Sequence, residues 1–290
     1  MNMRRIAVMC AALLACGAIL APLAAQGPAM EITYSPAPDW TLDRQLQLTI
    51  PDVALNDMPT GLFGSGTTTL RWTVVPAAEG EALDETALQG EVLSLTTVLA
   101  GQPMPASLLP VARIRISPQA IPVDLPTFKS DPLAPDRQLP QIGLAALGAA
   151  LLCALPPLPD HAVAVGDSWE RGGTFEIKEA VVGQVEVTQK IALTSLADGV
   201  ATFTSTVHAL LPDFQAPNPL LPGQTLTCQA MTVDVPELVQ TYDVARSQVT
   251  EARAKLNLKA NLVAPEMTAA VAVTGADLLY LELPPAAPQN

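Results

Sequence analysis

The chain has 290 residues and a formal net charge of −13, and this acidic balance disfavours nucleic acid as a partner because it repels phosphate. Hydrophobic residues make up 49% of the chain and charged residues only 15%, which excludes a disordered polypeptide. The 28 prolines favour many turns and strand edges over long helices.

An export signal is the first element that the sequence predicts. Arg4 and Arg5 precede an apolar run with small residues towards its end, and no charged residue follows before Glu31. This is the pattern of a secretory signal, whereas a soluble helix would keep a polar face. We therefore expect residues 1–25 to be a signal sequence. The exported protein would then be periplasmic, extracellular or anchored to a membrane of the bacterial envelope.

The fate of this signal has three alternatives. Cys16 lies in the stretch LLACG, which resembles the lipobox at which bacterial lipoproteins receive their lipid. A lipid attached at Cys16 would bring the protein to a membrane. Signal peptidase cleavage near Ala25 would instead release a soluble protein, although the preceding residues suit that enzyme poorly. The third alternative is an uncleaved anchor, because Ile6–Ala25 has about the 20 residues that cross a bilayer.

Two cysteines remain beyond the signal sequence, Cys153 and Cys228. In an oxidising compartment an even number of cysteines predicts a disulfide, so this pair is the candidate bond. The alternative is two buried free thiols, because Cys153 lies in an apolar run and a free cysteine packs as a small hydrophobic residue. Since no Cys-x-x-Cys pair is present, neither a thioredoxin-like redox site nor a zinc knuckle is expected.

Most of the chain beyond the signal has the pattern of β-strands. Apolar and polar residues alternate, as in antiparallel strands with one buried face, in residues 42–50, 67–75, 185–193, 201–209 and 255–263. Ala197–Gly199, between two of these stretches, predicts a hairpin turn. The glycine-rich residues 61–70 predict a hairpin loop rather than a phosphate-binding loop, because they lack the Gly-Lys-Thr ending.

One segment near the middle of the chain departs from this pattern. No charged residue occurs between Gln138 and Pro159, and Ile142–Leu155 is best interpreted as a helix. At about 1.5 Å per residue this helix is about 21 Å long, too short to cross a membrane. It is either a core helix packed on the sheet or a lid over an apolar cavity. In the second case the candidate ligand-lining residues are Ile142, Leu144, Leu147, Leu151 and Leu152.

The segment that follows carries a Pro-Asp-x-x-Val-x-Val-Gly-Asp-x-Trp run, with matching residues at Pro159, Asp160, Val163, Val165, Gly166, Asp167 and Trp169. It resembles an element of uncharacterised secreted and lipoprotein-like bacterial families, in which an apolar helix leads into a second set of strands. Some such proteins look like the open half-barrels of periplasmic lipoprotein carriers, with a helix that plugs a concave sheet. This resemblance covers residues 155–177 and implies a fold class and an apolar cavity, but no substrate. Physically, the run needs only a turn followed by a buried tryptophan.

Together these observations predict a mainly β protein. We expect antiparallel strands in one or two curved sheets, similar to a half-barrel, with one apolar helix near the middle of the chain. The expected organisation is an N-terminal β unit (26–138), an apolar linking helix (139–159) and a C-terminal β unit (160–290).

No catalytic, cofactor or metal site is predicted. The histidines are His161, in the turn element, and His208, on the polar face of a strand. Neither a Gly-x-Ser-x-Gly nor a His-Glu-x-x-His motif is present. The acidic residues between Glu79 and Glu91 lack the spacing of a calcium-binding loop and indicate a solvated loop.

The leading interpretation is therefore an exported, non-enzymatic envelope protein that binds an apolar ligand or lipid between sheet and helix. One alternative is a structural or partner-binding envelope protein with a filled core. The other is an enzyme whose site the sequence does not reveal. No cofactor and no nucleic acid are expected, and the sequence does not indicate an oligomeric state.

Overall fold

The structure is a computed structural model that describes residues 29–284 except 39, 79, 81, 83, 105–111, 124–126, 129–149, 178–182, 218–224 and 265–266. The predicted signal sequence, with Cys16, therefore lies outside the described residues, as do Ile142, Leu144 and Leu147. No helix in the described part of the chain is long and apolar enough to span a membrane.

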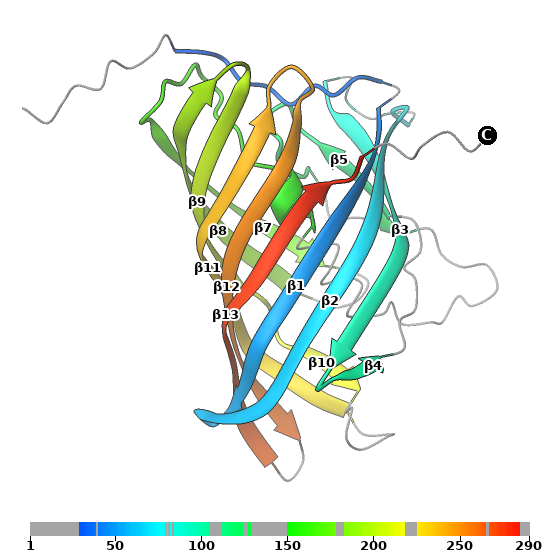
Figure 1. Ribbon diagram of the computed structural model, residues 1–290, viewed down its shortest axis with the longest axis vertical. Coiled ribbons are helices and arrows are strands. Elements are labelled where there is room, and N and C mark those ends of the chain that lie inside the picture. Colours follow the sequence, from blue (N-terminus) through cyan, green and yellow to red (C-terminus); the bar gives the residue numbers. More distant parts are fainter. Residues whose placement is uncertain are drawn as a thin grey trace, which may run out of the picture.

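The described residues form one antiparallel sheet of thirteen strands (Figure 1). The strands are β1 (Thr41–Leu55), β2 (Met58–Val75), β3 (Thr86–Leu99), β4 (Gln102–Met104), β5 (Ala112–Ile116), β6 (Thr127–Phe128), β7 (Ser168–Ile177), β8 (Gly183–Ala197), β9 (Val200–Leu210), β10 (Phe214–Pro217), β11 (Thr225–Asp243), β12 (Gln248–Ala264) and β13 (Met267–Glu282). The predicted mainly β class and antiparallel pairing are confirmed.

The first and last strands, β1 and β13, lie side by side in the middle of the sheet. From edge to edge the strand order is β6-β5-β3-β2-β1-β13-β12-β11-β9-β8-β7, while β4 and β10 add short pieces to β3 and β11. The sheet is curved but not closed, since β6 and β7 are its two edges (Figure 1). Because β1 pairs with β13, the predicted N-terminal and C-terminal β units contribute to a single sheet.

The alternation predicted from the sequence separates the two faces of this sheet. On β12, Ala252 and Ala254 are buried on the concave face, whereas Arg253 and Lys255 are exposed on the convex face. On β9, Phe203 is buried and its neighbour Thr204 is not. All five predicted strands lie within observed strands, and the β8–β9 turn at Asp198 and Gly199 is confirmed, with positive φ at both residues.

The glycine-rich prediction is wrong. Residues 61–70 belong to the long strand β2 and do not form a loop. The hairpin turn lies earlier, at Asn56 and Asp57, whose φ values of 49° and 65° are left-handed. Asn and Asp tolerate this conformation better than most residues, so they can make a tight turn without glycine.

Of the predicted linking helix, the structure describes residues 150–159, and the described helix ends after the first five of them. Within the described residues it covers only 150–154, followed by a last helical hydrogen bond from the Leu155 amide to the Leu151 carbonyl. Pro156 and Pro157 end it, because proline has no amide hydrogen and disfavours a helical residue before it. The predicted linking helix 139–159 is therefore wrong over 155–159, and 139–149 lie outside the described residues.

Three segments fill one end of the concave face, and we call them the plug: residues 29–37, 117–122 and 150–165. The Tyr34 amide donates to the Pro118 carbonyl at 2.7 Å, and the Leu158 amide donates to the Gln119 carbonyl at 2.7 Å. Figure 1 shows the short helix inside the curve of the sheet, near its upper end. On the sheet side, the side-chain amide of Gln240 donates to two carbonyls at the end of the helix, those of Leu152 at 3.2 Å and Cys153 at 2.9 Å.

The Pro-Asp-to-Trp run leads from the plug into β7; the predicted turn is confirmed, whereas Trp169 is half-buried and not fully buried. Gly166 has a φ of 100°, and an Asp167 carboxylate oxygen accepts the Ala164 amide at 2.8 Å, so these residues form a turn. The Trp169 indole donates to the Pro157 carbonyl at 2.8 Å, and its ring packs edge-on against Phe203. This run therefore anchors the plug to the first strand of the second half.

Candidate functional site

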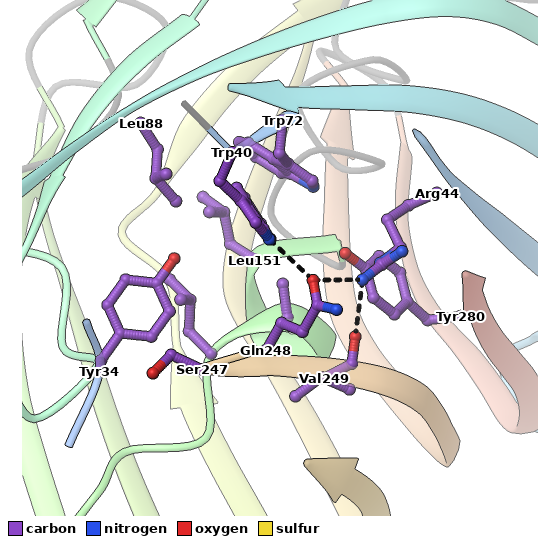
Figure 2. A pocket seen from close by; sticks show the side chains of 12 residues that line it. Tyr34, Trp40, Arg44, Trp72, Leu88, Leu151, Ser247, Gln248, Val249 and Tyr280 are labelled. Carbon is purple, nitrogen blue, oxygen red and sulfur yellow. Dashed lines mark hydrogen bonds between the residues drawn. The ribbon is translucent and has the colours of Figure 1, made fainter. Parts of the chain in front are cut away.

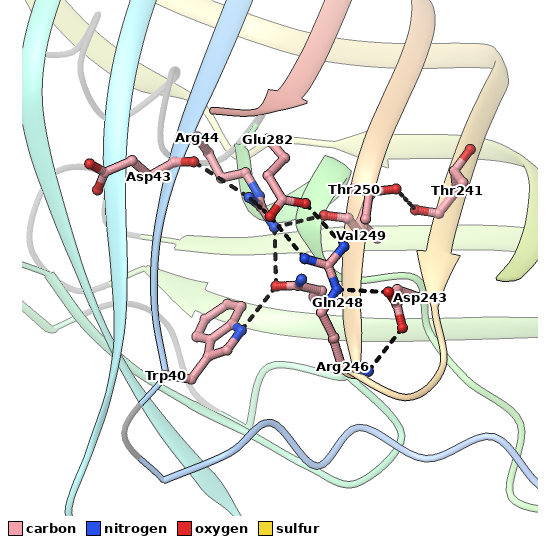
Figure 3. Close-up of polar contacts among 10 residues, drawn as sticks. All are labelled: Trp40, Asp43, Arg44, Thr241, Asp243, Arg246, Gln248, Val249, Thr250 and Glu282. Carbon is pink, nitrogen blue, oxygen red and sulfur yellow. Dashed lines mark hydrogen bonds and ion pairs between the residues drawn. The ribbon is translucent and has the colours of Figure 1, made fainter. Parts of the chain in front are cut away.

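The plug end of the concave face is held by a polar cluster around Arg44. Although it is charged, Arg44 on β1 is only 1% exposed. Its guanidinium donates to the Gln248 side-chain oxygen and to the Val249 carbonyl, each at 3.2 Å, and lies 3.7 Å from Glu282 (Figure 3). The same Gln248 oxygen accepts the Trp40 indole hydrogen at 2.9 Å. These bonds tie β1, β12 and the segment before β1 together.

A second ion-pair group continues the cluster towards solvent. Arg246, in the β11–β12 turn, donates to the carboxylates of Asp243 and Glu282 (Figure 3). Glu282 is thus shared between Arg246 and the buried Arg44. The two arginines and the two carboxylates balance in charge, which is a requirement for keeping Arg44 out of water.

Next to Arg44 lies a small cavity of about 20 Å³. Aromatic side chains and Leu151 of the helix line it (Figure 2). Two buried donors, the Trp72 indole nitrogen and the Gln248 side-chain amide nitrogen, have no geometrically good hydrogen-bond partner among the described residues. The volume suffices for about one water molecule. The plug end is therefore filled, and its cavity is too small for an organic ligand.

Burial also fixes the protonation of the tyrosines there. Desolvation raises the pKa of Tyr34 and of Tyr280, so both phenols stay neutral. Arg44 opposes this shift at both residues, but burial dominates. The lining thus offers neutral hydroxyl groups and one compensated cation, which is the chemistry of a structural core.

Beyond the plug the concave face changes character. One lateral row of directly paired residues crosses β8, β9, β11, β12, β13, β1 and β2, and we call it the apolar row: Val187, Ala209, Val233, Leu258, Val273, Val53 and Leu62. Directly paired residues point to the same face of a sheet, so these side chains lie together. Every position in the row is apolar.

The side chains of the apolar row lie at the margin of the core, against which Val187 and Val233 pack. Val273 is buried, most of the others are half-buried, and Leu62 is exposed. A second row, Ala260, Val271, Leu55 and Met58, lies closer to the β1–β2 turn and ends on two exposed side chains. Exposure thus rises towards the β1–β2 hairpin, at the end of the sheet opposite to the plug.

The neighbouring row on the convex face is polar. It pairs Thr188, His208, Asp234 and Asn257 across four strands. His208 Nδ1 lies 2.6 Å from an Asp234 carboxylate oxygen, above a surface hollow of about 280 Å³. The His208 side chain is 58% exposed, as expected for the polar face of a strand. An exposed pair of this kind is an ordinary cross-strand contact.

The candidate disulfide is not formed. Cys153 and Cys228 are both free and buried. The Cys153 carbonyl accepts a hydrogen bond from Gln240 on β11, whereas Cys228 lies twelve positions before Gln240 on that strand, at most about 40 Å away at 3.3 Å per residue. A disulfide requires α-carbons within about 7 Å. Burial raises the pKa of Cys153 to about 12, which makes it an inert core thiol.

Of the predicted ligand-lining residues, the structure describes Leu151 and Leu152. Both are half-buried and pack against the core, and Leu151 lines the small cavity at the plug end. They lie in the plug and are not members of the apolar row. The described residues contain no group of three metal-ligating side chains.

Sequence reasoning missed the apolar row as a unit. The alternation in residues 185–193, 201–209 and 255–263 places Val187, Ala209 and Leu258 each on the apolar face of its own strand. Their lateral alignment depends on the register of six ladders, which alternation within a single strand does not reveal.

Comparisons with known proteins give little further information. No protein-family model matches the chain, and no curated protein matches it. Among solved structures it is similar to DynF from the dynemicin biosynthesis pathway of Micromonospora chersina, with 10% sequence identity. That match covers 90% of this chain and 88% of DynF at a TM-score of 0.29, which carries no argument about fold or function.

Proposed function

We propose that the protein is an exported, non-enzymatic binding protein that shelters an apolar ligand, such as a lipid, against the apolar row. The observation that carries this proposal is the row itself, which is apolar at every position across seven strands but only half-buried at most of them. A protein that needed only a filled core would bury such a surface.

The plug end supports the same choice of site. Its cavity of about 20 Å³ has no room for an organic ligand, and the Arg44 cluster holds that end closed. Ligand sites in open β-structures are lined mostly by apolar side chains with few polar groups. Among the concave surfaces that the structure describes, the apolar row has this composition.

The ligand site can be tested with a neutral fluorescent probe, N-phenyl-1-naphthylamine. Leu258→Asn places an amide in the middle of the row, and we expect about tenfold weaker probe binding, because burial of a leucine contributes about 1.5–3 kcal/mol. Lys259→Asn is the matched control on the next, convex-facing position and should leave binding unchanged.

Two outcomes would contradict the proposed site. One is a native protein that does not bind the probe, together with native mass spectra that never contain a co-purified lipid. The other is equal binding by Leu258→Asn and Lys259→Asn. Either result would favour a structural or partner-binding protein with a filled core.

The export part of the proposal rests on Arg4, Arg5 and the apolar run after them. Mass spectrometry of the mature N-terminus, beside a Cys16→Ser variant, tests it. A diacylglyceryl group on Cys16 that disappears in the variant would identify a lipoprotein. An unmodified N-terminus near Gln26 in both proteins would identify a soluble exported protein, and an intact Met1 would contradict signal cleavage.

A further inference from the structure

We propose that the β1–β2 hairpin end inserts into the surface of a lipid bilayer, so that the apolar row opens towards the membrane. This inference rests on the proposed function for its purpose, but its evidence is the exposed side chains of the hairpin, of which only Leu62 belongs to the apolar row. The described residues contain seven large hydrophobic side chains that are exposed, and four of them lie between Leu55 and Phe63. Monomeric proteins rarely concentrate exposed apolar groups in this way unless the patch binds something.

The hairpin is apolar on both of its faces. Leu55 and Met58 pair directly beside the turn, and Met58 is 69% exposed. Leu62 belongs to the apolar row, whereas its neighbour Phe63 points to the opposite face and is 52% exposed. A concave ligand site would need apolar groups on one face only. Apolar groups on both faces fit a hairpin that is surrounded by an apolar medium.

The charges of the hairpin indicate the kind of surface. From Ile50 to Leu70 the only charged residues are Asp52 and Asp57, and no lysine or arginine is present. Anionic lipids attract basic segments, so they would not attract this hairpin. An apolar tip whose only charges are two acidic residues therefore matches a zwitterionic bilayer better than an anionic one, and it would enter this bilayer through apolar contact.

The position of the hairpin also suits transfer of an apolar ligand. Leu62 is continuous with Val53, Val273 and Leu258 through directly paired positions, so the path from the tip to the half-buried row is apolar throughout. Glu282, which pairs with Arg44, and Val271, which pairs with Leu55, are eleven positions apart on β13, at most about 36 Å at 3.3 Å per residue. The tip therefore stands well away from the plug.

Tryptophan quenching by brominated lipid tests the contact in the full chain. Phe63→Trp places a reporter at the tip, and Val200→Trp places one at the β8–β9 turn beside the plug end. Vesicles of phosphatidylcholine with brominated acyl chains should quench the emission of Phe63→Trp and leave that of Val200→Trp unchanged. Because the readout is local, attachment through another part of the chain would not produce this difference.

Three results would overturn the inference. The first is an absence of quenching at Phe63→Trp, and the second is equal quenching at both reporters. The third is an emission shift of Phe63→Trp that needs no vesicles but grows with protein concentration, since the tip would then bind a second copy of the chain. Replacing part of the phosphatidylcholine by phosphatidylserine should not strengthen the quenching.

A double variant separates this inference from the proposed function. Met58→Ser with Phe63→Ser removes the two most exposed apolar groups of the tip but keeps the apolar row. We expect it to lose binding to phosphatidylcholine vesicles by tenfold or more, because each side chain contributes about 1.4 kcal/mol or more when buried. It should still bind the naphthylamine probe. If the native protein does not bind the probe, the proposed function is wrong. Quenching at Phe63→Trp tests the membrane contact independently of that result.

Discussion

Replacement of Arg44 by methionine tests whether the plug end is held by a buried charge. Arg44 is almost completely buried and donates to Gln248 and to the Val249 carbonyl. Arg71, on the adjacent strand, is the matched control, because its side chain is 43% exposed and binds the Asp43 carboxylate through two bonds of 2.7 and 2.9 Å. The two arginines thus make similar polar contacts in different surroundings.

The expected magnitudes follow from those surroundings. Arg44→Met removes three hydrogen bonds from a charged donor, to Gln248 and to the carbonyls of Val249 and Asp43, at about 1–3 kcal/mol for each group left without a partner. The variant no longer needs to bury a charge, which offsets part of the loss, so we expect a net destabilisation of about 3 kcal/mol. Arg71→Met removes a surface ion pair and should cost about 1 kcal/mol or less.

Urea unfolding, monitored by circular dichroism, measures the free energy of unfolding of both variants. The midpoints can be compared if the dependence of this free energy on urea concentration, the m-value, is unchanged. Arg44→Lys keeps the charge but lacks the planar guanidinium group with its several N–H donors. Its free energy of unfolding should lie between those of the native protein and Arg44→Met. The reasoning would be refuted by an Arg71→Met variant that loses as much stability as Arg44→Met. A fully stable Arg44→Met would also refute it.

Three further predictions use other parts of the structure. Gly90→Ala would place a methyl group 2.4 Å from a ring carbon of Trp72, so thermal unfolding should show a loss of about 1–3 kcal/mol. A hydrogen bond from Arg71 lowers the pKa of Asp43; this stabilisation is therefore present above the unfolded pKa of about 3.9 and is lost as the pH falls through the folded value. The stabilities of the native protein and Arg71→Met should accordingly converge in acid. Burial raises the pKa of Cys153 to about 12, so maleimide should label this thiol at neutral pH only after unfolding, as mass spectrometry would show.

The strands that could be predicted are those with one polar face. In β12, leucine and alanine alternate with lysine and asparagine, because the sheet separates a packed concave face from solvent. β13 was not predicted, since it carries apolar residues on both faces at Leu278–Leu281. On the convex side Leu279 and Leu281 are half-buried, so the period-two signal is lost there although the strand is regular.

Local composition misled the prediction where tertiary structure decides. Residues 61–70 look like a loop because of their glycines, but pairing with β1 and β3 holds them in an extended strand. The apolar run around Cys153 looks like one long helix, but Pro156 ends it and the described helix covers only 150–154. The plug joins three segments far apart in the chain, and no local pattern predicts such contacts.

The candidate site could be predicted only in part, because it depends on register. Alternation places Val187 and Leu258 on inward faces, but their alignment in one row follows irregularities such as the shift between Leu256 and Leu258 in the β12–β13 ladder. A slip of one residue would turn a strand's apolar side chains to the other face. These shifts leave no clear mark in the sequence, so the row emerges only from the assembled sheet.

The two ends of the sheet differ in a way that restricts where a ligand can bind. At the plug end, polar bonds to Arg44 and a cavity with room for about one water leave no space for a larger molecule. Beyond the plug the concave face still holds buried polar side chains, such as the hydrogen-bonded pair Gln189 and Ser205, but the apolar row is apolar throughout and becomes exposed at Leu62. An apolar molecule that reaches Leu258 would therefore enter from the hairpin end, because that path exposes it to the fewest polar groups. If the hairpin contacts a membrane, an apolar molecule would have to move only along the apolar row, from Leu62 to Leu258, to pass from the bilayer to the ligand site.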